Sequence, residues 1–429
     1  MRKRGSKRDK RFVIGATAGI TLLLVLLGLN IARSGNNVRQ PIPRLYSIHD
    51  PQFLRTMGVL LGPAIVSGNR VDVLLNGDEI FPSMLQAIRS AQKTITFETY
   101  IYWSDPIGRE FAEALAERSR AGVKVHVLAD WIGSKINADD LSIMKDAGVE
   151  LHLYRPLRWY HLSRLNNRTH RKLLVVDGRV GFTGGVGVAA KWTGHAQDPD
   201  HWRDSHFRVV GPVVAQLQAA FMDNWTAATG HVLHGSDYFP VLQPSGPQAS
   251  QVFMSSPTGG SASMQLMYLL AIAAAEHSIS LSSAYFIPDA LTQETLVSAL
   301  KRGVKVQIIA PGAHIDSEIV RRASRARWGA LLEVGAELYE YQPTMYHCKV
   351  MIVDSLFTSV GSTNFDPRSF GLNAEANLNV FDADFAKRQL EIFQQDLARS
   401  RQLTFAQWRQ RPLLEKLSER TASLLGPIL

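Results

Sequence analysis

Two copies of one short pattern place residues capable of phosphoryl chemistry at matching positions along the chain. The copies, both reading H-x-K-x-x-x-x-D, are His170, Lys172 and Asp177, then His347, Lys349 and Asp354. Alternate residues of a strand project to one face, so each histidine shares a face with its lysine. A histidine can attack phosphorus or transfer a proton, and a lysine can stabilise charge on phosphoryl oxygens. Two such pairs together would make one complete site.

The residues that follow each copy extend the parallel. After Asp354 come Gly361, Ser362 and Asn364, which offer a hydroxyl and an amide to phosphate oxygens. The matching place after Asp177 reads Gly-Gly-Val-Gly, residues 184–187. One histidine and lysine at this spacing would be explained by a half-exposed strand, but two copies with matching flanks favour catalysis.

From about Asn76 to its C-terminus the chain resembles the phospholipase D superfamily, and within it the bacterial cardiolipin synthases. The segments that carry the resemblance are THRKLLVVDGRVGFTGGVGVAAKW, HWRDSHFRVVGPVV and HCKVMIVDSLFTSVGSTNFDPRSFGLNAEANL. The resemblance implies an α/β fold of two repeated phospholipase D-type sandwich domains, which form a pseudo-twofold body with the two signatures facing each other.

One residue departs from the family pattern, which usually has asparagine where this chain has Gly187. Backbone N–H groups of the glycine turn can replace the missing side-chain donor. We expect the substitution Gly187→Asn to be tolerated or beneficial.

The resemblance also implies roles for the site residues. One histidine forms a phosphatidyl-histidine while the other protonates the departing alcohol and then deprotonates the acceptor. The resemblance implies that His170 attacks phosphorus and that His347 transfers the protons, although the near symmetry of the halves leaves this assignment open. The phosphoryl oxygens are stabilised by Lys172, Lys349, Ser362 and Asn364.

Carboxylates complete the expected site. Each imidazole needs an acceptor for its far nitrogen, and Asp204 and Glu375 are the family-matched candidates. We expect Asp177 and Asp354 to be structural, as aspartates at turns. Glu98 lies in an expected strand, where a charge needs a partner; it either lines the site or forms an interdomain salt bridge.

Composition bounds the remaining possibilities. The chain has 429 residues, 45% of them hydrophobic, which is enough for two domains of about 150 to 200 residues. Its single cysteine, Cys348, excludes an intrachain disulfide. Neither a cysteine and histidine cluster nor a gathering of carboxylates indicates a metal. We therefore expect no metal and no other cofactor.

The formal charge of +9 is concentrated at the N-terminus. Seven basic residues and one aspartate before residue 12 contribute +6 of it, which leaves +3 for the rest. This distribution argues against a nucleic-acid partner. A membrane explains it better, because residues 12–32 contain no charged residue, a length sufficient for a helix that crosses about 30 Å of hydrocarbon.

These features predict a single-pass protein of the cell inner (cytoplasmic) membrane. The basic tail, residues 1–11, would lie in the cytoplasm and the catalytic body on the outer, periplasmic side. A cleaved signal peptide is the alternative, but its apolar core is usually about 7 to 15 residues long.

Internal repetition supports a two-domain organisation. Residues 87–105 align without a gap with residues 271–289, and a glycine turn at Gly122 or Gly303 follows each. The predicted order is a linker and membrane-proximal segment (33–75), a first domain (76–230), a connector (231–250), a second domain (251–404) and an amphipathic segment (405–429). Packing of that last segment on its own domain is favoured over membrane contact.

These interpretations converge on a membrane-anchored phosphatidyltransferase that makes cardiolipin and glycerol from two phosphatidylglycerol molecules. Its expected partners are phosphatidylglycerol, other phospholipids and the membrane, with no obligate protein partner. A phospholipase D that hydrolyses phospholipids to phosphatidic acid is the alternative, and a phosphodiesterase acting on nucleic acid is disfavoured. A non-catalytic lipid-binding protein would require degenerate signatures, which are intact here.

Overall fold

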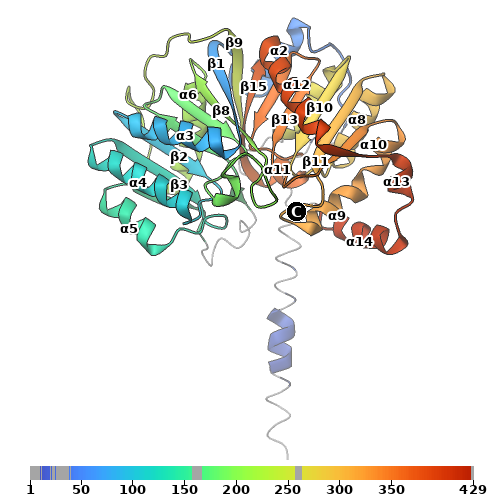
Figure 1. Ribbon diagram of the computed structural model, residues 1–429, viewed down its shortest axis with the longest axis horizontal. Coiled ribbons are helices and arrows are strands. Elements are labelled where there is room, and N and C mark those ends of the chain that lie inside the picture. The colour runs from blue at the N-terminus through green and yellow to red at the C-terminus, as the bar shows by residue number, and fades with distance from the viewer. Residues whose placement is uncertain are drawn as a thin grey trace, which may run out of the picture.

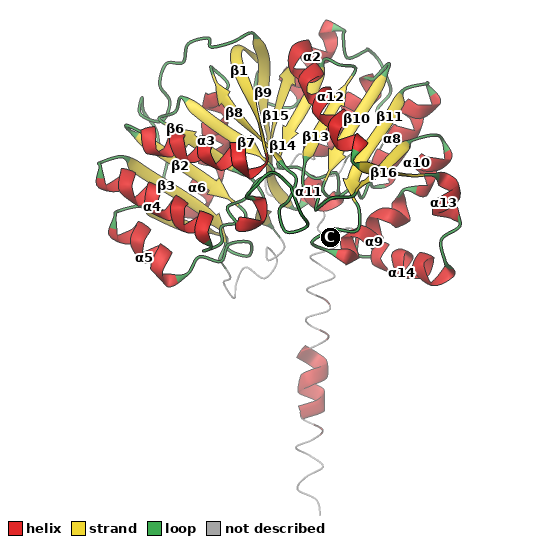
Figure 2. Cartoon of the chain, viewed as in Figure 1, coloured by secondary structure: helices red, strands yellow, loops and turns green. Residues whose placement is uncertain are grey.

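The computed structural model describes residues 10, 12–19, 21, 25, 38, 40–156, 167–256 and 263–426. Two lobes lie side by side, each built on a sheet with helices packed against it (Figures 1 and 2). We call residues 66–230 the first half and residues 248–403 the second half. The fold is a mixed α/β fold, as the sequence predicted.

The first half forms a mixed sheet in the order β4-β3-β2-β6-β7-β8-β1. Its strands are β1 (Val66–Leu75), β2 (Thr94–Thr99), β3 (Lys124–Asp130), β4 (Glu150–Tyr154), β6 (Leu173–Val176), β7 (Val180–Gly184) and β8 (Ser205–Val210). Strands β2, β3 and β4 are parallel, whereas β6 pairs antiparallel with β2. The signature strand β6 thus lies in the middle of the sheet.

The second half repeats this order as β12-β11-β10-β13-β14-β15-β9, with β16 added beside β12. Its strands are β9 (Gln248–Ser255), β10 (Ser278–Ser283), β11 (Lys305–Pro311), β12 (Glu337–Tyr341), β13 (Lys349–Val353), β14 (Phe357–Gly361), β15 (Asn373–Phe381) and β16 (Ser400–Leu403). Antiparallel pairing of β1 with β9 joins the two sheets. One sheet therefore runs through both halves.

Helices cover both faces of this sheet. Three helices, α3 (Asn76–Ser90), α4 (Pro106–Arg120) and α5 (Ala138–Asp146), pack on the first half. Helices α7 (Ser263–Ala274), α8 (Ala290–Lys301) and α10 (Gly329–Glu333) pack on the second. Between the halves, α6 (Val214–Thr229) and α12 (Ala383–Ala398) bury residues such as Phe221 and Phe393 in a core cluster that includes strands of both sheets. Burial of this shared apolar surface holds the halves together.

Local sequence explains where several elements begin and end. The side chains of Asp105 and Asp289 accept hydrogen bonds from the first-turn amides of α4 and α8, as N-caps do. The turns before β3 and β11 use Gly122 and Gly303 at φ 90° and 94°, conformations that glycine adopts without steric cost. The two halves thus use the same glycine turn between a helix and the strand that follows it.

Helices and a strand also lie in the segments outside the two predicted domains. Residues 33–75, predicted to be a linker and membrane-proximal segment, include α2 (Pro51–Leu60) and β1, the strand that joins the two sheets. Helix α2 buries Phe53 and Met57 against the second half. At the C-terminus, the predicted amphipathic segment forms α13 (Phe405–Arg409) and α14 (Leu413–Ser423). Helix α14 packs against α9 (Glu318–Arg327) while its leucines 413, 414 and 417 remain exposed.

The structure corrects the prediction of a membrane-spanning helix at residues 12–32 and the single-pass inner-membrane location drawn from it. In the part of the chain that the structure describes, no helix is both long and apolar enough to cross a membrane. Within the predicted span, the structure describes residues 12–19, which are helical, and residues 21 and 25. The remainder of the span and most of the basic tail lie outside the described residues.

Candidate active site

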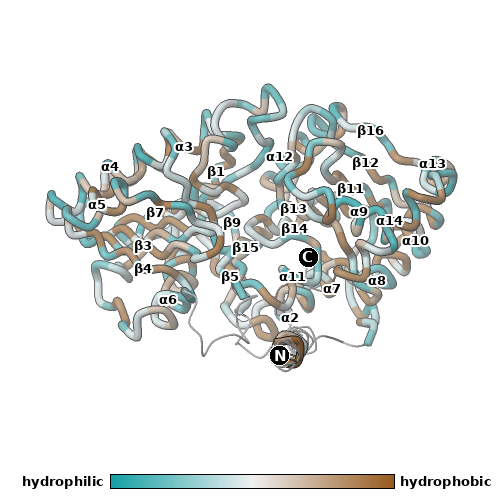
Figure 3. The backbone as a smooth tube through the Cα atoms, turned by 90° about the horizontal axis from the view of Figure 1, so that it is seen from below, coloured by the Kyte–Doolittle hydropathy of each residue, from teal (hydrophilic) through white to brown (hydrophobic). Residues whose placement is uncertain are grey.

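Strand β5 (Arg168–Thr169), which comes just before His170, and α11 (Pro367–Gly371) lie near the centre of the molecule (Figure 3). Strand β5 pairs in parallel with the start of β15, and the His170 amide donates to the Ala374 carbonyl at 2.8 Å. In the same way, the His347 amide donates to the Arg203 carbonyl at 2.8 Å. The backbone of each half therefore fixes the histidine of the other.

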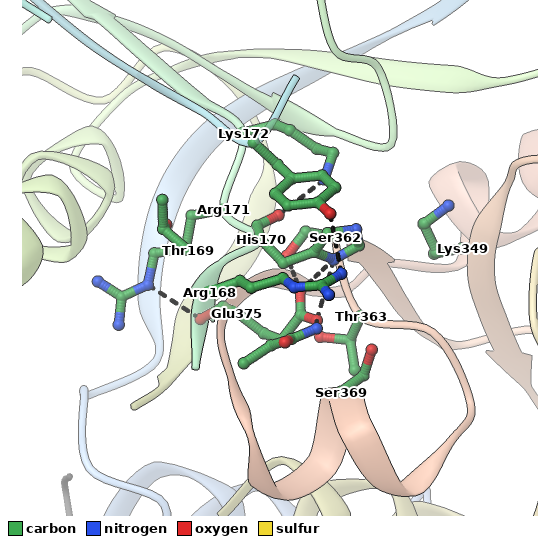
Figure 4. Close-up of polar contacts among 12 residues, drawn as sticks. Arg168, Thr169, His170, Arg171, Lys172, Lys349, Ser362, Thr363, Ser369 and Glu375 are labelled. Atoms are coloured by element: carbon green, nitrogen blue, oxygen red, sulfur yellow. Dashed lines mark hydrogen bonds and ion pairs between the residues drawn. The ribbon is translucent and has the colours of Figure 1, made fainter. Parts of the chain in front are cut away.

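The imidazoles are held crosswise by carboxylates. The Nδ1 atom of His170 lies 3.0 Å from both carboxylate oxygens of Glu375, a residue of the second half (Figure 4). The Nδ1 atom of His347 lies 2.7 Å from Oδ2 of Asp204, a residue of the first half. Because Nδ1 is engaged in both rings, Nε2 is the nitrogen left to react. The sequence had singled out both carboxylates, but the structure shows which histidine each one holds.

The lysines lie beside their histidines, as the strand alternation predicts. Lys172 Nζ donates to the His170 carbonyl at 2.8 Å, and Lys349 Nζ likewise donates to the His347 carbonyl. The residues between them point the other way. Arg171 is fully buried and donates to the Glu375 carbonyl and to Asp223.

A cavity of about 360 Å³ contains both imidazoles. Beyond the histidines, its lining includes Tyr100, Ile101, Arg168, Lys172, Trp192, Trp202, Tyr285, Asp316, Ser317, Val320, Asn364, Asp366, Arg368, Ser369 and Asn373. This volume falls at the lower end of the range for small-molecule sites, about 300 to 1,000 Å³. The cavity therefore suits a polar headgroup with its phosphate, while acyl chains must extend out of it.

Burial sets the protonation of the histidines and lysines. It lowers the pKa of His347 to about 4 and that of His170 well below its ordinary value, with the neighbouring lysines adding to both shifts. It also lowers the pKa of Lys172 to about 7 and that of Lys349 below its ordinary value. These shifts favour neutral imidazoles, the form that can attack phosphorus. An anionic phosphate bound there would favour the protonated forms.

The pKa values of the two orienting carboxylates are shifted in opposite directions. Burial raises the pKa of Glu375 to about 7 even though Lys172 counteracts it. For Asp204, burial also opposes ionisation, but contact with His347 and the charge of Lys349 hold its pKa below the ordinary value. Trp192 contributes a hydrogen bond of 3.1 Å from its indole N–H to Asp204.

Of the two other predicted site residues, one lines the cavity and the other does not. Asn364 lines the cavity, and one polar atom of its amide is buried without a hydrogen-bond partner among the described residues. Ser362 is fully buried, and its hydroxyl donates to Glu375 (Figure 4). The structure therefore brings Asn364 to the cavity, whereas Ser362 contacts the carboxylate that holds His170.

The two signature aspartates lie away from the cavity. Asp177 accepts hydrogen bonds from the amides of residues 92–94, and Asp354 accepts them from residues 276–278. Both have positive φ, at 52° and 49°. Each thus ties the turn after a signature strand to the start of the neighbouring strand.

Crowding around Gly187 opposes the expected benefit of asparagine there. A Cβ atom at this position would lie 2.9 Å from Ile101 Cβ and 3.1 Å from the Ile101 carbonyl oxygen. It would also lie 3.3 Å from the Trp192 ring. Both neighbours line the cavity, so a larger side chain at Gly187 would displace its wall.

Glu98 is fully buried behind His170 and is absent from the cavity lining. It accepts hydrogen bonds from Thr169 and, at 2.6 Å, from Asn224. Burial raises its pKa to about 7, although the Arg171 charge opposes the shift. Its partners belong to the first half, so it supports the His170 strand from within that half.

Several residues that contact the histidines lie outside the predicted site. His347 packs against Trp192 and Trp202 at ring-centroid distances of 5.3 and 5.4 Å, and His170 packs against Tyr100 at 5.2 Å. The two tryptophans lie outside the expected strands, so periodicity gave no signal for them. The sequence did contain a signal for Arg168, because the alternation that places His170 and Lys172 on one face of the strand also places residue 168 on that face.

Comparison with known proteins identifies the family. The family model described as cardiolipin synthase, PLD-like domain, matches residues 84–225 and 268–397. Cardiolipin synthase A of Pseudomonas fluorescens strain Pf-5 is 35% identical over 378 residues, covering 88% of this chain and 78% of that protein. The major cardiolipin synthase of Bacillus subtilis strain 168 is 34% identical over 365 residues, covering 84% and 76%. The chain therefore belongs to the cardiolipin synthase family of phospholipase D-like proteins, which confirms the resemblance seen in the sequence.

A solved structure supports the fold independently. The crystal structure of phosphatidylserine synthase from Haemophilus influenzae Rd KW20 superposes with a TM-score of 0.66 and covers 84% of this chain and 95% of that one. The sequence identity is 15%, so this likeness concerns the fold alone.

Proposed function

We propose that this protein is a phosphatidyltransferase that converts two phosphatidylglycerol molecules into cardiolipin and glycerol. The observation that carries the proposal is the pair of crosswise histidine and carboxylate contacts facing one cavity. The family supplies the substrate class, because the relatives that match most of this chain are named cardiolipin synthases.

The reaction we propose has two displacement steps at phosphorus. In the first, Nε2 of one imidazole attacks the phosphorus of the donor, and the phosphorus–oxygen bond to glycerol breaks. The other imidazole, protonated once phosphate is bound, gives its proton to the departing glycerol oxygen. A phosphatidyl-histidine results.

In the second step, the hydroxyl of a second phosphatidylglycerol loses its proton to the imidazole that had acted as acid. Its oxygen attacks phosphorus, the phosphorus–nitrogen bond breaks, and cardiolipin forms. Lys172, Lys349 and Asn364 stabilise the phosphoryl oxygens in both steps. Glu375 and Asp204 hold the rings and favour the protonated state of the imidazole that each contacts.

We also infer that the two halves are repeated domains related by a pseudo-twofold axis that passes through the cavity. The matching strand orders and the reciprocal contacts between halves support this arrangement.

Lipid mass spectrometry tests the function directly. Purified full-length protein would be incubated with phosphatidylglycerol in mixed micelles, beside the variants His170→Ala and His347→Ala. We expect cardiolipin and free glycerol in equal amounts from the wild type and neither from the variants. Phosphatidic acid as the sole product would identify a hydrolase instead, and product from either alanine variant would contradict the two-histidine mechanism.

A further inference from the structure

Two arginines outside the signatures line the same cavity as the histidines. Arg168 comes from β5, two residues before His170, and Arg368 comes from α11 in the second half. Strand alternation places the side chains of Arg168, His170 and Lys172 on one face. The site therefore contains more positive charge than its two lysines supply.

The arginines have no counterpart in the other half of the cavity. In the repeat alignment the signatures are offset by 177 residues, so Arg168 corresponds to Met345, which is apolar and buried. Arg368 corresponds to Lys191, which is exposed and absent from the cavity lining. The histidine of the second half instead packs against Trp192 and Trp202. The two arginines thus add positive charge only on the side of the cavity that holds His170.

Two buried carboxylates near this pair accept hydrogen bonds from backbone amides. Asp366 caps α11 by accepting from the Ser369 amide at 2.8 Å, and Asp130 accepts from three backbone amides. Burial raises the pKa of Asp366 to about 7 and that of Asp130 to about 6. Burial and the charge of Arg168 lower the pKa of Arg368 to about 10. The charge of Arg168 thus acts on Arg368, as expected of two guanidinium groups that line one cavity.

Arg168 retains hydrogen-bonding capacity. One of its terminal nitrogens donates to the Tyr100 hydroxyl at 2.9 Å, a neutral partner. Its Nε is buried without a hydrogen-bond partner among the described residues. A guanidinium in this state suits a phosphate, whose oxygens can accept several N–H bonds at once.

The proposed reaction contains an anion that the signature residues do not account for. The donor phosphate lies between the histidines, beside Lys172 and Asn364. The acceptor phosphatidylglycerol carries its own phosphodiester, three carbons away from the attacking oxygen. In cardiolipin the same two phosphates are joined by one glycerol. Hydrolysis or transfer to a simple alcohol involves no second phosphate.

We propose that Arg168 and Arg368 form a second phosphate subsite, which binds the phosphodiester of the acceptor lipid and so selects phosphatidylglycerol over water and neutral alcohols. The proposal rests on the function proposed above and adds to it the residues that choose the acceptor. It makes Arg168 and Arg368 specificity determinants, separate from the groups that act on the reacting phosphorus.

The experiment measures how one donor is divided among competing acceptors. Wild type, Arg168→Gln and Arg368→Gln would each be given phosphatidylglycerol in mixed micelles containing 1-butanol, and cardiolipin, phosphatidylbutanol and phosphatidic acid would be quantified by mass spectrometry. Lys191→Gln is the matched control, because it removes a positive charge at the position that the repeat aligns with Arg368.

We expect each arginine variant to form cardiolipin about 10 to 100 times more slowly, since a charge-assisted hydrogen bond contributes about 1.5 to 3 kcal/mol. Phosphatidylbutanol should form within about twofold of the wild-type rate, because the donor subsite is intact. That retained activity also shows that the variant is folded. The Lys191→Gln control should keep the wild-type product ratio. Arg168→Lys should recover part of the cardiolipin activity, because lysine keeps the charge but loses the paired donors.

Other outcomes separate this inference from the function on which it rests. An equal fall of all three products would mean that the arginines hold the donor or the fold, and an unchanged product ratio would mean that they bind no acceptor; both overturn the subsite. If the wild type forms phosphatidylbutanol and phosphatidic acid but no cardiolipin, the proposed function fails and the acceptor subsite fails with it.

Discussion

His170 and Glu375 stand 205 residues apart in the chain, yet the imidazole Nδ1 lies 3.0 Å from both carboxylate oxygens. The reciprocal contact of His347 with Asp204 measures 2.7 Å. Each half thus supplies a histidine to the cavity and a carboxylate to the partner histidine. Neither half alone contains a histidine together with the carboxylate that contacts it, so both halves are needed to form each pair.

The orienting carboxylates should be required for turnover but not for folding. Glu375→Gln and Asp204→Asn keep the shape but replace the carboxylate that fixes each ring with a neutral amide, so we expect the kcat for cardiolipin formation to fall about 100-fold or more. The surface variant Glu113→Gln should behave as wild type. Steady-state kinetics provide the measurement, and a change confined to KM would contradict the positioning role.

Ser362 should act through Glu375. Because its hydroxyl donates to that carboxylate, Ser362→Ala should lower kcat by about tenfold with little change in the KM for phosphatidylglycerol. Direct contact with phosphate would instead raise KM. In the double variant with Glu375→Gln, the serine effect should largely disappear, because residues of one hydrogen-bonded unit are not additive.

Substitution of Gly187 should destabilise the cavity wall. The close approach to Ile101 and Trp192 predicts that Gly187→Ala and Gly187→Asn each lower the free energy of unfolding by about 1 to 3 kcal/mol, the usual cost of overpacking. Thermal denaturation of both variants tests this. A Tm equal to or above that of the wild type for Gly187→Asn would restore the expectation drawn from the sequence.

Glu98 should make stability depend on pH. Its folded pKa, about 7, exceeds the usual 4.5, so the folded state holds the proton more tightly. Its contribution is complete below pH 4.5 and is lost as the pH rises through 7, for a total of at most about 3 kcal/mol.

The variant Glu98→Gln isolates this contribution. Between pH 5 and pH 8, the free energy of unfolding should fall further in the wild type than in the variant, because only the wild type carries the Glu98 carboxyl group. Urea denaturation at the two pH values measures the difference. An identical decline with pH in variant and wild type would show that Glu98 does not titrate in this range.

Local patterns predicted much of the fold and site. Duplicated signatures, glycine turns and β-branched strands were visible in the sequence because each depends on neighbouring residues. The crosswise pairing of His170 with Glu375 was not, because it depends on how the two halves meet. Ser362 was misplaced for a related reason: spacing puts it near the signature but does not say which side of the imidazole it occupies.

Strand β1 shows a different limit. Its residues come before residues 87–105, the segment in which the repeat was visible in the sequence, so that alignment gave no reason to include them in a domain. In the structure this strand pairs with both β8 and β9. Its role is set by long-range pairing, which a single sequence does not reveal.

The antiparallel pairing of β1 with β9 and the core cluster shared by α6 and α12 tie the two lobes together at two places. Separation of the lobes would break both, so we expect donor, glycerol, acceptor and product to use the cavity in succession without a large opening of the molecule. In the proposed reaction the first product departs before the second lipid reacts, which predicts ping-pong kinetics. Each lipid would enter the cavity only after the previous product has left it.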